Sequence, residues 1–146
     1  MREILFRGKA INRDKGFHRT SYKNGDWVYG LVTRLFDERF ENLPAEMTNV
    51  DGTSGIEIDY KTVGQYTGLT DRNRKKIFEG DIVKHMQDDI LINYGIVNWD
   101  KKNARWAYHT NVMNECFAFY NPKAFEVIGN IHDNPELYPE LLRGEK

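Results

Sequence analysis

Hydrophobic and polar residues alternate over short segments along most of this chain. Such alternation puts apolar side chains on one face of an extended strand, and short alternating segments separated by turn residues are typical of antiparallel β-structure. The pattern predicts strands at residues 2–9, 27–35, 56–59, 82–85, 95–99, 105–109, 116–120 and 125–131. The last five follow one another at near-regular spacing, which predicts a small SH3-like barrel in the C-terminal half.

Turn residues separate the predicted strands. Asn24 and Gly25 precede the second strand, and this dipeptide favours the positive φ angles of a hairpin turn. Residues 37–55 lose the alternation, so we expect a long surface loop there, and we expect another loop at residues 87–94. Asp71 begins a charged turn that its side chain can form by bonding to its own backbone.

A chain of 146 residues is long enough for one compact domain or for two small modules that share a core. We predict a mostly β protein with an N-terminal β-rich portion at residues 1–70. This portion is expected to pack on residues 71–146, which hold the SH3-like β-barrel and a C-terminal tail. The sequence leaves open whether the two portions form one continuous unit.

Composition and charge bear on the fold class and on the kind of ligand. Eight Tyr, eight Phe and three Trp favour strands, because aromatic side chains suit a pleated, half-buried surface. The formal net charge is −1, whereas a strongly basic chain would have indicated phosphate neutralisation. This balance disfavours direct nucleic-acid binding, although local basic patches keep it possible.

The pattern of apolar residues predicts a cytoplasmic protein without a membrane segment. The apolar patch at residues 4–6 is too short for a secretory signal, and no segment has the length of a membrane span. Cys116 excludes an intramolecular disulfide because it has no partner, and its setting predicts a strand in which the thiol packs as a small hydrophobe.

No motif for catalysis, metal or cofactor binding emerges from the polar residues. The four histidines lack zinc-ligand spacing: His18, His85, His109 and His132. Asp81, near Glu79, is expected to organise the turn that enters a strand, and His132 with Asp133 is expected in a surface turn. We therefore predict no metal, no cofactor and no enzymatic activity, with an unrecognised hydrolase as an alternative.

The predicted hairpin at residues 99–108 combines aromatic and basic side chains. The candidate binding residues there are Trp99, Lys101, Lys102, Arg105, Trp106 and Tyr108. Aromatic rings can stack on nucleobases or dock a peptide beside such cations. The alternative is that Trp99 and Trp106 close the barrel core while the charges mark a solvated turn. Alternation puts Trp106 and Tyr108 on one face, so both are inside or both are outside.

A second basic segment lies in the turn after the N-terminal portion. Its candidate binding residues are Arg72, Arg74, Lys75 and Lys76. A dense basic run can contact phosphate, but as a solvated turn it needs no special role, and we favour that interpretation. The two basic segments together define the nucleic-acid surface that the sequence suggests.

Six segments in order, spanning residues 1 to about 137, resemble the YopX family. They read Met-Arg-Glu-Ile-Leu-Phe-Arg-Gly-Lys, Asn-Gly-Asp-Trp-Val-Tyr-Gly, Thr-Val-Gly-Gln-Tyr-Thr-Gly-Leu-Thr-Asp, Ile-Phe-Glu-Gly-Asp-Ile-Val, Gly-Ile-Val-Asn-Trp and Val-Ile-Gly-Asn-Ile-His-Asp-Asn-Pro-Glu-Leu. The resemblance implies a phage or prophage origin and a β-barrel-like architecture. It implies no catalytic residue.

These observations favour a non-enzymatic binding or accessory module that contacts a host or phage protein. Self-association is a related expectation, because unpaired sheet edges invite pairing. Nucleic-acid binding through the two basic segments is the alternative from another class, and it predicts a salt-dependent affinity.

Overall fold

The computed structural model describes residues 2–12, 22–35, 45–110 and 115–137, and it divides the chain into two compact units, Met1–Gln65 and Tyr66–Lys146. Strands dominate the described part of both units, which confirms the prediction of a mostly β protein. All strand pairings are antiparallel among the described residues.

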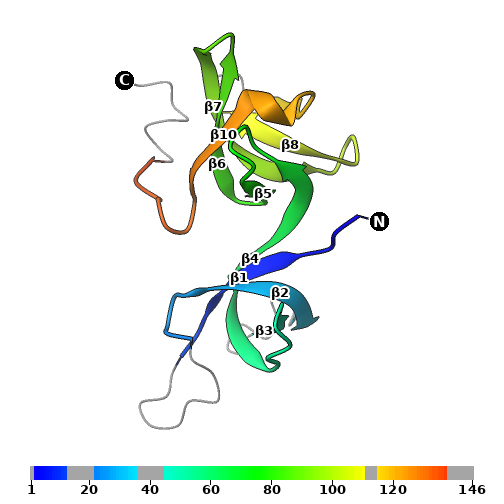
Figure 1. The fold of residues 1–146 in the computed structure, drawn as a ribbon, viewed down its shortest axis with the longest axis vertical. Helices are drawn as coiled ribbons and strands as arrows, with labels where there is room; N and C mark the ends of the chain where they lie inside the picture. Colours follow the sequence, from blue (N-terminus) through cyan, green and yellow to red (C-terminus); the bar gives the residue numbers. More distant parts are fainter. Residues whose placement is uncertain (1, 13–21, 36–44, 111–114, 138–146) are drawn as a thin grey trace. The chain divides into compact units, whose positions relative to one another are not determined.

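The strands of the first unit pair in a circuit (Figure 1). They are β1 (Phe6–Ala10), β2 (Trp27–Arg34), β3 (Ala45–Asn49) and β4 (Ile56–Thr70). β1 pairs with β2 and β4, and β3 pairs with the same two strands. Each of these strands therefore has two hydrogen-bonded neighbours within the circuit, and β4 continues into the second unit, where it also pairs with β5.

Alternating side chains fill the centre of the first unit. Val28, Met47 and Ile58 come from three different strands and are fully buried. β2 and β3 approach closely at Gly30, where a Cβ atom would collide with the backbone carbonyl of Thr48. Only glycine therefore allows this strand pairing without a backbone shift.

The second unit is built on a five-stranded sheet with the order β10-β6-β7-β8-β9 (Figure 1). Its strands are β6 (Asp81–Gln87), β7 (Ile90–Asp100), β8 (Arg105–Thr110), β9 (Glu115–Ala118) and β10 (Phe125–Asn130). A 3₁₀ turn, η2 (Pro122–Ala124), precedes β10, and β5 (Lys76–Phe78) pairs with the end of β4. Consecutive strands β6 to β9 are neighbours, as hairpin connections require.

An aromatic cluster forms the core of the second unit. The rings of His85 and Phe125 stack with centroids 4.7 Å apart, and Tyr108 meets Phe125 edge-on at 4.9 Å. The Tyr108 hydroxyl lies 3.2 Å from Nδ1 of His85. Aliphatic side chains complete the cluster: Ile77, Val83, Val97 and Val127.

Two of the predicted loops contain strands instead. Residues 45–49 form β3 inside the predicted loop at 37–55, of which residues 37–44 lie outside the described part of the chain. β3 was missed because its apolar positions are only Ala45 and Met47, and neighbouring strands provide its burial. The predicted loop at 87–94 is also wrong, since β6 reaches Gln87 and β7 begins at Ile90.

Candidate functional site

The β7–β8 hairpin brings the two predicted tryptophans together. Trp99 pairs with Trp106 across the two strands, and the rings meet edge-on with centroids 5.2 Å apart and an interplanar angle of 76°. Trp106 packs against the core and Tyr108 is buried, so the prediction that both face the same way is confirmed. Trp99 is 43 % exposed, so it lies at the rim and does not close the core.

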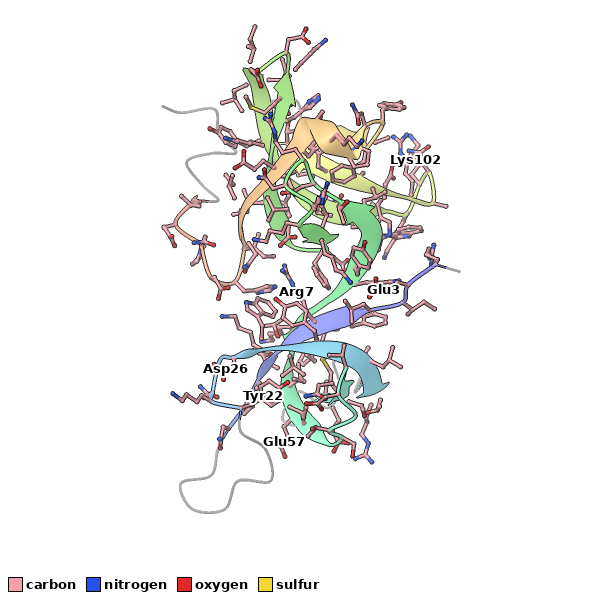
Figure 2. All side chains as sticks on the ribbon, viewed as in Figure 1. Glu3, Arg7, Tyr22, Asp26, Glu57 and Lys102 are labelled. Carbon is pink, nitrogen blue, oxygen red and sulfur yellow. The ribbon has the colours of Figure 1, made fainter. Side chains whose placement is uncertain are left out.

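A buried carboxylate fixes the turn of this hairpin. Asp100 accepts hydrogen bonds from the side chain of Asn103 at 2.8 Å, from its backbone N–H at 3.3 Å, and from Nε of Arg105 at 3.2 Å. These bonds, chiefly the one from the Asn103 side chain, lower the pKa of Asp100. Lys101 and Lys102 are exposed in the turn, and Figure 2 shows Lys102 at the end of the hairpin.

The basic run after β4 is arranged around a second buried carboxylate. Asp71 accepts backbone hydrogen bonds from Asn73 at 2.8 Å and from Lys75 at 2.9 Å, which confirms the predicted turn. Its other oxygen accepts from the backbone of Val127 at 2.9 Å. Arg74 is exposed at a φ of 64°, in the conformation that this turn requires.

The remaining basic side chains of the run contact different partners. Arg72 lies 3.4 Å from Asp89 in the β6–β7 turn, and the ammonium of Lys76 lies 5.0 Å from the ring centre of Tyr66. Lys75 is exposed. The run therefore spreads over the surface of the second unit, with Arg72 and Lys76 engaged in local contacts.

The acidic residues and histidines considered for catalysis hold turns. Asp81 accepts a hydrogen bond from the backbone of Phe78 at 2.8 Å, at the entry to β6 as predicted. Asn130 accepts from the backbones of His132 and Asp133 at 3.0 and 2.8 Å, so these two residues form the predicted turn. In the part of the chain that the structure describes, no three His, Cys, Asp or Glu side chains gather as metal ligands.

The β6–β7 hairpin presents an apolar tip that sequence analysis missed. The apolar tip consists of Ile90, Leu91 and Ile92, which are 65, 42 and 49 % exposed. Gln87 pairs with Ile90 across a two-residue turn of Asp88 and Asp89, whose φ angles of 50° and 61° suit a type I′ turn. The run Ile-Leu-Ile has strong strand propensity, and this signal could have revealed the strand.

Neighbouring strands do not cover the apolar tip among the described residues. The β10 pairing with β6 begins at His85, and the β8 pairing with β7 begins at Ile96. The β6–β7 register shifts between His85 and Met86, which leaves Ile92 as an extra residue in β7. Such a bulge bends the strand and re-aims its side chains.

A cavity of about 400 Å³ lies against the second unit, lined by Ile96, Asn98, His109, Ile131 and Pro135. Ile96 and Asn98 alternate with the buried Val97, which places the cavity on the face of β7 opposite the core. The described residues of its lining include no carboxylate, lysine or arginine. Among the described residues, no helix has the length and apolar character needed to cross a membrane.

Comparisons with known proteins identify the family of this chain. The family model described as YopX protein matches residues 14–138. The chain belongs to the YopX family. This YopX-family chain is also similar to the crystal structure of protein EF1440 from Enterococcus faecalis, with 24 % identity and a TM-score of 0.50 over 92 % of this chain and 97 % of that chain. That likeness shows the fold, and no curated protein matches the chain.

Proposed function

We propose that this YopX-family chain is a non-enzymatic binding module that contacts a protein partner through the apolar tip of the β6–β7 hairpin. The supporting observation is the exposure of three consecutive aliphatic side chains, Ile90, Leu91 and Ile92. Full burial of such a side chain contributes about 1.5–3 kcal/mol, so covering the tip would provide a large part of a specific affinity. A contiguous exposed apolar patch is typical of an interaction site.

The bulge at Ile92 favours contact through side chains over addition of a partner strand. A regular free edge offers evenly spaced N–H and C=O groups, and a bulge interrupts that spacing. The partner we propose therefore carries an apolar groove that receives the tip. Two exposed aspartates, Asp88 and Asp89, precede the uncharged tip. In the complex they would face a polar or basic rim around the partner's groove.

The use of the buried carboxylates supports binding over hydrolysis. Asp71, Asp81 and Asp100 each accept backbone N–H groups of their own turns. A carboxylate held in this way contributes to folding and is poorly placed for acid–base work on a substrate. The second unit therefore offers a rigid frame from which the hairpin projects.

The proposal also covers the type of barrel in the second unit, the cellular location of the protein and the source of its partner. We infer that the second unit is an SH3-like barrel, that the protein is cytoplasmic, and that its partner comes from a phage or its host. The antiparallel hairpins from β6 to β9 and the family membership support this. Backbone NOEs that join β9 to β4 or β5 would support closure of the barrel, and rapid amide exchange along a free β9 edge would contradict it.

Quantitative co-purification tests the binding role. Tagged wild-type chain is compared with I90K/I92K and with V50K, a matched control at a residue that is 77 % exposed in the first unit. We expect a partner that is recovered equally by wild type and V50K and at least about tenfold less by I90K/I92K. Light scattering of the purified chain shows whether the partner is a second copy. Equal recovery by all three folded proteins would overturn the proposal.

A further inference from the structure

We propose that the end of the β7–β8 hairpin is a binding site for single-stranded nucleic acid, where Trp99 stacks on one base and Lys101 and Lys102 contact the adjoining phosphates. This site lies on a different hairpin from the apolar tip, and it is independent of the proposed protein contact. Two features carry the inference: a half-exposed indole held in place by its neighbour, and cations on a turn whose shape is fixed.

Trp99 is pre-organised for stacking. Trp106 packs against the core and meets the Trp99 ring edge-on at 5.2 Å, so one tryptophan orients the other while 43 % of Trp99 stays exposed. An aromatic side chain that is already ordered loses little entropy when a ligand stacks on it. Every base has an aromatic face, so such a site accepts any sequence.

Lys101 and Lys102 follow Trp99 directly after Asp100, and Asp100 fixes the turn that carries them. Its three hydrogen bonds, from Asn103 and Arg105, bind both sides of the segment that carries Lys101 and Lys102. The hairpin end thus has three cationic side chains and one carboxylate in a chain with a net charge of −1. The turn next to Trp99 in the chain therefore carries an excess of positive charge, as binding of a nucleic-acid backbone requires.

The geometry favours a single strand over a duplex. A hairpin end with one exposed ring needs a base whose face is accessible, and the bases of a duplex are already stacked on each other. Contacts with two or three phosphates give a shallow salt dependence, with a slope of log K against log salt of about −1.4 to −2.1. We therefore expect modest affinity, strongest at low salt.

The test measures binding of a fluorescein-labelled 12-nucleotide oligo-dT by anisotropy at low salt. W99L should weaken binding about 5- to 150-fold, the range given by loss of one stacked base, and W99Y should restore most of it. K101E/K102E should weaken binding and flatten the salt slope. R74E/K75E is the matched control, because it reverses two exposed cations on another turn of the same unit.

Two results would overturn this inference. One is a failure of the oligonucleotide to bind the wild-type chain at low salt. This result would overturn the inference even if the same hairpin end bound a peptide. The other is an equal loss of affinity in R74E/K75E and K101E/K102E with no effect of W99L, which would indicate diffuse electrostatic attraction. Circular dichroism of each variant verifies that the fold is retained.

Discussion

The carboxylate of Asp71 accepts a hydrogen bond from the backbone N–H of Val127 at 2.9 Å, although the two residues are 56 positions apart. The same carboxylate holds the turn before β5 through Asn73 and Lys75. One buried side chain therefore connects the first turn of the second unit with its last strand, β10. This connection places Phe125 and Val127 in the aromatic core.

Removal of the Asp71 carboxylate should destabilise the second unit strongly. D71A leaves three backbone N–H groups without their acceptor, and we expect a loss of about 2–4 kcal/mol in the free energy of unfolding. D59A is the control, because Asp59 accepts a local, exposed hydrogen bond from Lys61 within β4. Urea denaturation in a W27F background, followed by the fluorescence of Trp99 and Trp106, measures the stability of the second unit in both variants. Equal stability of D71A and wild type would contradict this role.

The stability of the second unit should decrease as the pH falls below neutrality. Burial lowers the pKa of His85 below its ordinary value of 6.5, so the folded state favours the neutral ring. Above pH 6.5 the ring is neutral in both states and its contribution is complete. As the pH falls, the unfolded chain takes up the proton first, and stability is lost until the pH passes the folded-state pKa.

Urea midpoints measured between pH 8 and pH 5 test the His85 dependence. Wild type should show a midpoint that falls with pH in this window, and H85Q should lose that part of the slope. The control is H109Q, which changes a histidine on the opposite face of the sheet. Identical slopes for wild type and H85Q would show that another group is responsible.

The two paired tryptophans should differ in their effect on folding. W106A removes a ring that packs against the core, and we expect it to cost about 2–3 kcal/mol. W99A removes a rim side chain, so about 1 kcal/mol or less is expected. Thermal unfolding of both variants gives the comparison. A larger cost for W99A would place that ring in the core.

Gly30 tests the close pairing of β2 and β3 in the first unit. G30A should cost about 2 kcal/mol or more, because the new methyl group would meet the Thr48 carbonyl and the Asn49 Cα, which are backbone atoms that cannot rotate away. V50A changes an exposed side chain nearby and should stay within about 0.5 kcal/mol of wild type. Trp27 fluorescence in a W99F/W106F background reports this unit separately.

Local signals in the sequence predicted the turns and most strands. The features that they did not predict depend on contacts between residues far apart in the chain. The Asp71 turn depends on neighbouring backbone and was predicted, but the bond to Val127 joins segments that only the folded chain brings together. The pairing of Trp99 with Trp106 follows from a hairpin. The two rings differ in exposure because of how the rest of the core packs around them. The alternation of apolar and polar residues does not predict that packing.

The exposure of the apolar tip could not be predicted from local sequence either. Ile90, Leu91 and Ile92 form part of β7, although sequence analysis predicted a loop at residues 87–94. Once a strand is assumed, apolar residues are expected to be buried. Their exposure follows from the point where β8 and β10 begin their pairings, which local sequence does not encode.

Site-specific photo-crosslinking shows whether the β6–β7 tip contacts a protein. A benzophenone amino acid is placed at position 92, or at position 50 as the control, and the chain is irradiated in its native cells. We expect one discrete protein adduct from position 92 that is absent or much weaker from position 50. This adduct should disappear when Ile90 is also replaced by Lys. No adduct from position 92, or the same adducts from both positions, would contradict the proposed contact.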